Sequence, residues 1–417
     1  MDINNFETVC IVGWAKTGIS LCNLLLFLKK EIRVTEIKTR ENFTSSLIDK
    51  FRERGVKFEF GGHSENFIKT SQLIILSPGV DVLSSAVVGI SRALNIPCVG
   101  EIEFSYWLTK AKFIAITGTN GKTTTSYLTY RVLRERRKRV FLGGNIGRPL
   151  SSFVLNTKKG DLIVLEVSSF QLETILQFRP YVAAVLNIEP DHLDRYLTFD
   201  EYFKAKMNIF KNQKNVDWAV LNKKSDLCKV IEKRIKSKLS FFSSEFSNEN
   251  FSCVYRIASI FGASKLDCLK VFSAFGGLAH RLQFVRKFKE ITFINDSKAT
   301  NPASTIWALK NIKTPVILIA GGKDKGLDYS QILPYLKKVK KINLFGKASF
   351  KIKDALNSHA NTEIFSSLED VVATSFKESD SGDTILFSPM CSSFDMFSDY
   401  RQRGKKFIEI VKNLQYK

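Results

Sequence analysis

The sequence predicts an α/β protein of three domains with mostly parallel sheets, and three observations support this fold class. The chain has 417 residues, more than one hydrophobic core usually supports, so two or three domains are expected. Short apolar, β-branched runs typical of buried strands recur along it. Each run ends in a Gly-rich or polar turn that opens a helix-like segment, the alternation expected of parallel sheets. We expect domains at residues 1–100, 101–279 and 280–417.

The composition is that of a globular protein, with 44% hydrophobic and 25% charged residues. No apolar run approaches the ~18 residues that span a bilayer, and the acidic segment 1–7 does not read as a signal peptide. Seven dispersed cysteines, without a Cys-x-x-Cys pair, indicate reduced thiols. We therefore expect a cytoplasmic protein without stable membrane insertion.

The charge is strongly positive, because 63 basic residues stand against 41 acidic ones and leave +22. A field of this size attracts phosphorylated ligands, nucleic acid and anionic membranes alike. Basic residues cluster at 131–139, 233–238 and 337–341, with helix-like spacing and without interleaved aromatic residues. Solvated helix faces are the favoured interpretation. A nucleotide-hydrolysing protein that binds nucleic acid remains the alternative from a different class.

The first segment has the pattern of a Rossmann-like domain. A buried-strand run at 8–12 leads into the turn Gly13–Gly18, an apolar helix at 19–28 and a second strand at 32–35. Glu36 then stands where an acid would meet a ribose hydroxyl. Ala15 occupies the place of the middle glycine of the dinucleotide fingerprint, which argues against a nicotinamide oxidoreductase. A further strand at 73–76 runs into Ser77-Pro-Gly79.

The second segment contains a phosphate-binding loop. The run 114–125 reads as a strand, the turn Gly118-x-x-Gly121 and a helix that opens with Lys122 and Thr123. Glycines let backbone N–H groups point at an anion, the lysine neutralises outer phosphates, and the threonine hydroxyl can ligate Mg²⁺. We therefore predict a P-loop domain that binds a nucleoside triphosphate.

Two later features of this segment suggest metal chemistry. A strand at 161–166 ends in Glu166, where an acid beside a P-loop commonly serves Mg²⁺ directly or through water. Another strand leads through Asn187 to His192, which Asp191 and Asp194 flank. A lone histidine is more often a packing or surface residue than a ligand, but this position at a strand's carboxyl end favours a functional role.

The third segment has the pattern of a second Rossmann-like domain. Strands at 291–294, 316–319 and 384–387 each deliver a polar loop expected to open a helix, so a parallel sheet would carry three loops on one edge. Lys298, Lys325 and Ser393 lie on these loops and are suited to holding a substrate with carboxylates.

Taken together, these motifs resemble the Mur ligases, the ATP-dependent amino-acid ligases of peptidoglycan precursor synthesis. The P-loop, Asp191-His192 and His280-Arg281 are typical of the whole family. The loop at 295–302 and the run Ser168-Ser-Phe-Gln-Leu-Glu173 are similar to those of the member that adds D-glutamate. The loop argues against a related ligase such as folylpolyglutamate synthase. The order of motifs matches along the whole chain.

The resemblance implies a reaction and its cofactors. The alanyl carboxylate of UDP-N-acetylmuramoyl-L-alanine would attack the γ-phosphate of ATP, and D-glutamate would then attack the acyl phosphate. Two Mg²⁺ sites are implied, one at Thr123 and Glu166 and one at His192. A carbamylated lysine completes the second site in the family, and Lys206 matches its position among the nearby lysines 204, 206, 211 and 214. Catalysis would thus involve Lys122, Glu166, His192 and Lys206.

The resemblance also implies binding residues and partners. ATP would contact Gly118, Thr119, Asn120, Gly121, Lys122, Thr123, Thr124, Asn250, Arg281 and Asp296. The UDP-sugar would contact Lys16, Thr17, Glu36, Ile37, Gly79, Asn145 and His192. D-Glutamate would contact Lys298, Thr300, Lys325, Ser393, Phe394 and Tyr400. The expected partners are these small molecules, with no nucleic acid, and the expected state is a monomer.

The chain departs from the family pattern at three places. Ala15 replaces a glycine near the UDP, and Ile37 stands where a polar uracil contact is common. Phe246-Ser247 replaces a His-Asn pair before the adenine-contacting asparagine, which leaves Asn250 to make that contact.

Overall fold

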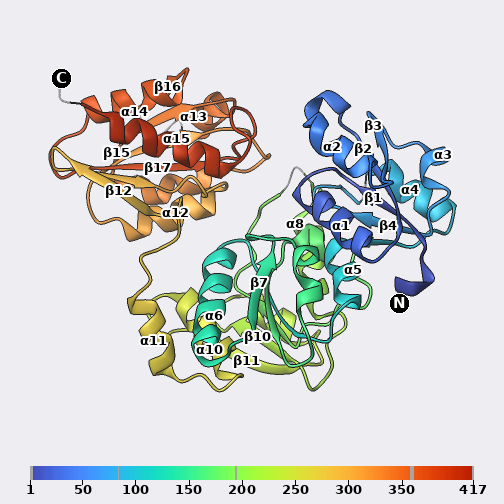
Figure 1. Ribbon diagram of the computed structural model, residues 1–417. Coiled ribbons are helices and arrows are strands. Elements are labelled where there is room, and N and C mark those ends of the chain that lie inside the picture. Colours follow the sequence, from blue (N-terminus) through green and yellow to red (C-terminus); the bar gives the residue numbers. More distant parts are fainter. Residues whose placement is uncertain (1–2, 83, 193–194, 357–360, 416–417) are drawn as a thin grey trace. The chain divides into compact units, whose positions relative to one another are not determined.

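The computed structural model describes residues 3–82, 84–192, 195–356 and 361–415. Its three sheets are mostly parallel (Figure 1), which confirms the predicted fold class. The chain divides into two compact units, residues 1–188 with 200–274 and residues 189–199 with 275–417. The first unit contains two of the sheets and the second contains the third.

The first sheet is parallel throughout, in the order β3-β2-β1-β4-β5. Its strands are β1 (Thr8–Val12), β2 (Glu31–Glu36), β3 (Lys57–Phe60), β4 (Leu73–Leu76) and β5 (Cys98–Gly100). Its helices are η1 (Ile3–Asn5), α1 (Lys16–Phe27), η2 (Arg40–Asn42), α2 (Ser45–Arg52), α3 (Glu65–Ile68), α4 (Ala86–Ala93) and α5 (Glu101–Trp107). The first helix begins at Lys16, three residues before the predicted start. It directly follows Ala15, whose backbone is extended.

The second sheet is also parallel, in the order β11-β10-β9-β6-β8-β7. Its strands are β6 (Lys112–Thr117), β7 (Val140–Gly144), β8 (Leu162–Glu166), β9 (Val182–Val185), β10 (Trp218–Asn222) and β11 (Lys238–Phe242). Its α-helices are α6 (Lys122–Arg136), α7 (Ser169–Leu172), α8 (Phe199–Met207), α9 (Cys228–Glu232), α10 (Glu249–Ser259) and α11 (Lys265–Ser273). Short 3₁₀ segments are η3 (Leu150–Ser152), η4 (Val154–Asn156) and η5 (Asn208–Phe210). Strands β6, β8 and β9 are nearly continuous apolar runs because both faces of a parallel sheet are covered.

The third sheet has the order β12-β13-β17-β14-β15-β16, in which only the β12–β13 pair is antiparallel. Its strands are β12 (Gln283–Phe288), β13 (Ile291–Asn295), β14 (Val316–Gly321), β15 (Val339–Phe345), β16 (Thr362–Phe365) and β17 (Thr384–Met390). Its helices are α12 (Pro302–Asn311), η6 (Ser330–Lys338), α13 (Ser349–Ala355), α14 (Leu368–Lys377) and α15 (Tyr400–Asn413). The helix expected after β14 is thus a 3₁₀ helix, with Pro334 inside it, and proline disfavours an α-helix interior.

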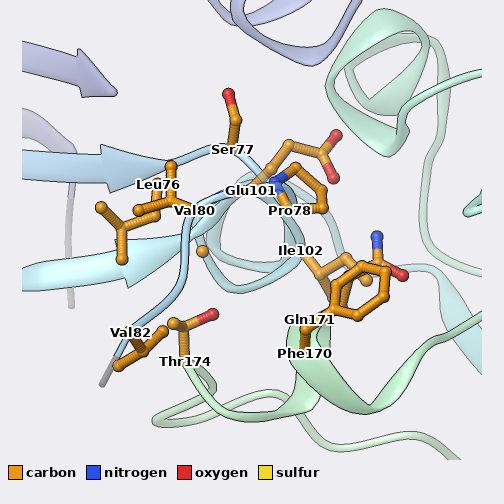
Figure 2. Close-up of a pocket in the computed structure, with 11 residues that line it drawn as sticks. Leu76, Ser77, Pro78, Val80, Val82, Glu101, Ile102, Phe170, Gln171 and Thr174 are labelled. Atoms are coloured by element: carbon orange, nitrogen blue, oxygen red, sulfur yellow. The ribbon is translucent and has the colours of Figure 1, made fainter. Parts of the chain in front are cut away.

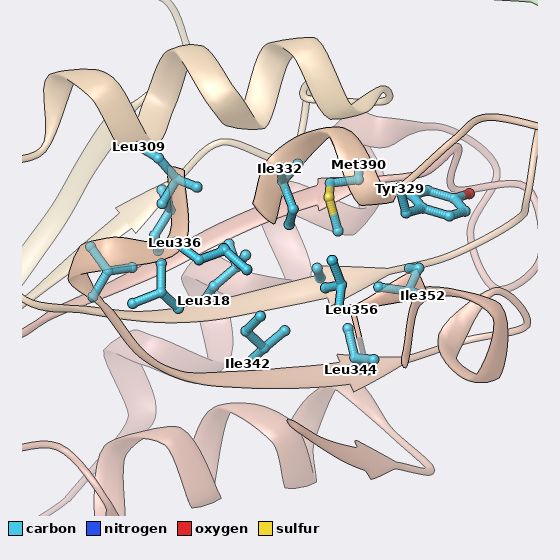
Figure 3. Packing of buried hydrophobic residues seen from close by; sticks show 14 of the residues in the cluster. Leu309, Leu318, Tyr329, Ile332, Leu336, Ile342, Leu344, Ile352, Leu356 and Met390 are labelled. Carbon is cyan, nitrogen blue, oxygen red and sulfur yellow. The ribbon is translucent and has the colours of Figure 1, made fainter. Parts of the chain in front are cut away.

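Two apolar clusters build the core of the second unit, one on each face of its sheet. In Figure 3, Leu318 of β14 and Ile342 of β15 pack with Ile332 and Leu336 of η6 and with Leu309 of α12. The other cluster joins the same sheet to α14 and α15. Helices on both faces hold the strands rigidly, so the loops at their carboxyl ends are positioned by a packed scaffold.

Candidate active site

The predicted phosphate loop has the expected strand-turn-helix context. Strand β6 ends at Thr117, and Gly121 caps α6 in the left-handed region with a φ of +83°. A Cβ at Gly121 would lie 2.3 Å from the Asn250 side-chain oxygen. Glycine is therefore required there for both conformation and space. The turn places its N–H groups at the start of a 15-residue helix, where an anion is stabilised.

Asn187 holds the loop in place. It follows β9, which lies next to β6. Its backbone carbonyl accepts from the Thr119 N–H at 2.9 Å. Its side chain accepts from the Asn120 N–H at 2.8 Å and donates to the Asn120 carbonyl at 3.2 Å. Asn187 has no predicted role, although a polar side chain after a neighbouring strand was a usable signal.

Lys122 and Lys206 converge on the loop. The Lys122 ammonium donates to the carbonyls of Gly118 and Thr119, each at 2.8 Å. The Lys206 Nζ donates to the same Gly118 carbonyl at 2.9 Å and lies 4.5 Å from the Tyr202 ring centre. Lys206 is only 1% exposed. Of the four lysines 204, 206, 211 and 214, all of them in the described part of the chain, only Lys206 is buried.

Glu166 ends β8 beside the loop, and its register partner on β6 is Ile116. The side chain is buried, and Oε1 accepts from the Asn145 amide at 3.1 Å. Thr123, also buried, lies in the first turn of α6. One carboxylate and one hydroxyl next to a phosphate loop fit Mg²⁺, which is usually bound by few protein ligands and by phosphate oxygens. Within the described residues, no group of three or more His, Cys, Asp or Glu side chains forms a metal cluster.

Asn250 lies against the start of α6, and its adenine contact stays a prediction. It is the second residue of α10, and its N–H donates to the capping Asn248 side chain at 2.9 Å. Its side-chain oxygen accepts from the Thr125 hydroxyl at 3.3 Å. The departure at Phe246-Ser247 therefore leaves Asn250 next to the phosphate loop.

The first sheet presents a second turn at its carboxyl edge. The carboxylate of Glu36 accepts from the N–H of Trp14 at 2.7 Å and from the N–H of Lys38 at 3.0 Å. A Cβ at Gly18 would lie 2.0 Å from the Gly13 carbonyl, so this helix turn requires glycine. Ala15 has a φ of −119°, an ordinary extended value, and the turn therefore forms without the missing glycine.

The other predicted UDP-sugar residues of the first unit lie near such edges. Lys16 and Thr17 open α1, and the Lys16 ammonium donates to the Gly147 carbonyl. Ile37 is 64% exposed after β2, and Gly79 is exposed after β4. Figure 2 shows a small pocket in this region, lined by Ser77 and Pro78 after β4 and by Phe170 and Gln171 of α7. Its volume of about 10 Å³ is room for about one water molecule.

In the second unit, Asp296 follows β13 and is buried. Its carboxylate accepts from the Leu282 N–H at 3.1 Å and from the Ser388 hydroxyl at 2.9 Å. Burial raises the pKa of Asp296 to about 7, although the Arg281 charge and these hydrogen bonds oppose the rise. The structure thus brings the two predicted ATP residues of this unit, Arg281 and Asp296, close together.

Asp191 and Lys325 form a buried ion pair in the same unit. Lys325 Nζ lies 3.3 Å from Asp191 Oδ1, and both side chains are at most 10% exposed. The Asn301 amide donates to Asp191 Oδ2 at 3.0 Å. Asn301 also caps α12, where it accepts from the Ser304 N–H. Lys325 therefore pairs with a carboxylate of the protein itself, and its predicted contact with D-glutamate stays a prediction.

His192 follows in the left-handed region with a φ of +56°. Its N–H donates to Asp191 Oδ1 at 2.9 Å, and its Nε2 lies 3.8 Å from Asp191 Oδ2. The ring is 33% exposed. Asp194, the other predicted flanking acid, lies outside the described residues.

The remaining predicted D-glutamate residues lie on the loops after β13 and β17 and at the start of α15. Lys298 Nζ is 5.4 Å from the Tyr400 ring centre. Thr300 is partly buried, Ser393 is buried, and Phe394 is 68% exposed.

Arg403 is a residue that sequence reasoning missed. It is fully buried on α15, and burial lowers the pKa of its guanidinium to about 10. The guanidinium donates to the Ser297 hydroxyl and carbonyl at 3.1 and 2.8 Å. It also donates to the carbonyls of Cys391 and Ser392 at 3.0 and 3.1 Å. Arg403 therefore ties together the two loops that carry Lys298 and Ser393.

Three family models match the chain in order. Residues 7–100 match the Mur ligase MurD-like N-terminal domain, residues 116–285 the Mur ligase middle domain, and residues 280–391 the Mur ligase glutamate ligase domain. Among solved structures, the MurF ligase from Thermotoga maritima in complex with ADP is similar, with a TM-score of 0.61 at 17% identity over 91% of this chain and 94% of that one. A pseudomurein peptide ligase type C from Methanothermus fervidus has a TM-score of 0.59 at 17% identity over 98% and 100% of the two chains. These likenesses concern the fold, which is that of the three-domain Mur ligases.

Relatives that are similar in sequence show to which kind of Mur ligase the chain belongs. A UDP-N-acetylmuramoylalanine--D-glutamate ligase from Caldanaerobacter subterraneus subsp. tengcongensis is 35% identical over 98% of this chain and 99% of its own length. The enzyme of the same name from Geotalea uraniireducens is 35% identical over 99% of both chains. The chain belongs to the family of UDP-N-acetylmuramoylalanine--D-glutamate ligases. In the described residues, no helix combines the length and apolar character needed to cross a membrane.

Proposed function

We propose that this protein joins D-glutamate to UDP-N-acetylmuramoyl-L-alanine at the expense of ATP, through an acyl phosphate, and releases ADP and phosphate. The observation that carries the proposal is a P-loop on which Lys122 and buried Lys206 converge, in a chain similar over its whole length to D-glutamate ligases. The reaction serves peptidoglycan precursor synthesis, and we propose a cytoplasmic monomer.

Phosphoryl transfer requires positioning and charge neutralisation more than covalent help. The turn from Gly118 to Thr124 would cradle the phosphates with its N–H groups. Lys122, which now donates to two loop carbonyls, would turn its charge to the β- and γ-phosphates. Asn250 would contact the adenine side, and Arg281 with Asp296 would complete the nucleotide site.

Mg²⁺, when bound, would neutralise phosphate charge and polarise the transferred group. Thr123 and Glu166 would hold one ion, and the Asn145 hydrogen bond would orient the Glu166 carboxylate. His192 and Lys206 would serve a second ion.

Carbamylation of Lys206 has a physical rationale in the loop itself. Two ammonium groups that donate to one Gly118 carbonyl repel each other. Carbamylation replaces one of these cations by an anion, so that the repulsion between Lys122 and Lys206 becomes attraction. The carbamate also supplies the oxygen ligands that Mg²⁺ prefers.

The two other substrates would use the turns already described. The UDP-sugar would lie along Lys16, Thr17, Glu36, Ile37 and Gly79, with Asn145 and His192 toward its alanyl end. D-Glutamate would be held by Lys298, Thr300, Lys325, Ser393, Phe394 and Tyr400. The Asp191–Lys325 pair at 3.3 Å supports this assignment, because a substrate carboxylate can replace that of Asp191. We propose that the three functions lie in domains at 1–100, 101–279 and 280–417.

The test is phosphate release from ATP by the purified protein with UDP-N-acetylmuramoyl-L-alanine, with D-glutamate, L-glutamate or other amino acids added in turn. We expect release that depends on both the nucleotide-sugar and D-glutamate. Release that is indifferent to both, from folded protein, would contradict the proposal and favour the nucleic-acid-binding alternative, which predicts salt-sensitive stimulation by DNA or RNA.

A further inference from the structure

A cleft lies in the first unit, at the edge of the second sheet that is opposite the phosphate loop. Its volume is about 490 Å³, which is within the range of small-molecule sites. Lys112 opens β6, Tyr181 precedes β9 and Asp217 precedes β10. These three strands are parallel neighbours, so the cleft lies at their amino ends. The phosphate loop follows the other end of β6, roughly 17 Å away along the strand.

The cleft is positively charged. Lys110, Lys112 and Arg179 line it, and Asp217 is the acid among its lining residues. The Arg179 guanidinium donates to both Asp217 oxygens, at 2.6 and 3.1 Å. The Lys214 N–H donates to the same carboxylate at 2.7 Å. Asp217 is therefore committed to Arg179. The two lysines outnumber Glu103, a buried carboxylate behind the lining residues Trp107 and Gln177, so the cleft keeps an excess of positive charge that suits a phosphate.

Aromatic rings form the other part of the lining. Tyr106, Trp107 and Tyr181 face the cleft, and Lys112 Nζ lies 4.2 Å from the Tyr181 ring centre. Lys112 Nζ thus lies over one face of the Tyr181 ring. A phosphate that draws the ammonium aside would open that face to a planar base.

The aromatic wall is held rigidly by Glu103, a buried carboxylate with no predicted role. It accepts from three consecutive backbone N–H groups, those of residues 176–178, at 2.8 to 2.9 Å. It also accepts from the Trp107 indole N–H at 2.7 Å. Because this carboxylate fixes α5 and the 176–178 segment together, the cleft is formed before any ligand arrives, which lowers the cost of binding.

We propose that this cleft is a binding site for nucleoside monophosphates, separate from the phosphate loop and independent of the ligase reaction. Lys110 and Lys112 hold the phosphate, and the rings of Tyr181 and Trp107 stack on the base. Both halves of the ligand contribute, because the site combines charge with aromatic faces.

The experiment is hydrogen exchange of the full-length protein, measured by mass spectrometry with increasing AMP or UMP. We expect at least one of them to slow exchange at residues 106–113 and 176–181. The double substitution Lys110→Glu/Lys112→Glu and the single substitution Tyr181→Leu should each weaken this protection about tenfold or more. Lys110→Arg/Lys112→Arg should retain it. Lys159→Glu is the matched control, because it reverses an exposed charge that precedes β8 outside the cleft.

ATP protection of residues 118–124 should be the same in all these variants, which shows that they are folded. The Lys122→Ala protein should keep the cleft protection, because the cleft does not use the phosphate loop. The proposal is overturned if neither nucleotide protects the two segments, or if the glutamate double variant responds like the wild type. Equal protection by inorganic phosphate alone, or by adenosine alone, also overturns it, because the site would then recognise only one half of a nucleotide.

Discussion

Replacing Asp296 by asparagine should remove a pH-dependent weakness of the second unit. Burial raises the pKa of this carboxyl from its ordinary value of 3.8 to about 7 in the folded protein. Well below pH 3.8 the group is protonated in both states, and its ionisation contributes no difference in stability. As the pH rises toward 7, the unfolded chain loses this proton first, so the folded unit becomes progressively less stable. A difference of about three pH units at 1.36 kcal/mol each corresponds to about 4 kcal/mol.

The Asp296→Asn protein lacks this titration, so its stability relative to the wild type should rise by about 4 kcal/mol between about pH 4 and pH 8. Cys391 supplies the assay, because it is buried and is the sole cysteine of residues 275–417. The protein is incubated in urea at each pH with an activated disulfide that still reacts in acid. Labelling of Cys391, detected by mass spectrometry, then reports unfolding of this unit. Asp328→Asn is the control, because hydrogen bonds to Ser330 lower the pKa of that exposed carboxyl and reverse the sign. A stability difference between Asp296→Asn and wild type that does not change with pH would refute the reasoning.

Three further substitutions test the proposed chemistry. Lys122→Ala should lower kcat for phosphate release by about 10²–10³-fold because phosphate charge is no longer compensated; near-normal turnover would remove Lys122 from the site. Lys206→Ala should be nearly inactive and partly restored by added short carboxylic acids, whereas the exposed neighbour variant Lys204→Ala should behave like the wild type; full activity without rescue would contradict the carbamate. Arg403→Lys should raise KM for D-glutamate about tenfold, because one ammonium cannot replace four hydrogen bonds to two loops, and KM for ATP should change less, because Leu282 and Ser388 also hold Asp296; a lowered melting temperature with unchanged KM values would reduce Arg403 to a structural role.

Local patterns in the sequence predicted the fold class and the phosphate loop well. The strand that ends at Thr117, the glycines at 118 and 121 and the carboxylate of Glu166 all follow from neighbouring residues. Such features depend on contacts within a few residues, or on the shared edge of a parallel sheet. A helix does follow β14 as expected, but it is a 3₁₀ helix with Pro334 inside it, and proline disfavours an α-helix interior.

Features that depend on distant contacts could not be predicted in the same way. Arg403 meets Ser297 across 106 positions of sequence, and Lys325 meets Asp191 across 134. An arginine in an amphipathic helix reads as a surface residue until the loops around it are in place. Lys206 was likewise equivalent in pattern to its neighbours, and resemblance to the family selected it. Its burial, which sets it apart from those neighbours, also depends on distant contacts.

The charges at the phosphate loop suggest how a lysine at position 206 would act together with Lys122. Lys122 and Lys206 both donate to the Gly118 carbonyl, so two positive charges lie close together at the loop. A phosphate that draws Lys122 away relieves the repulsion, and a carbamate on Lys206 relieves it from the other side. The repulsion between the two ammonium groups can be removed only once. Either change alone is therefore enough to relieve it, and the second change gains nothing further from this effect. If both occur during turnover, Mg²⁺ must provide the remaining attraction between a carbamate and a phosphate that would otherwise repel each other.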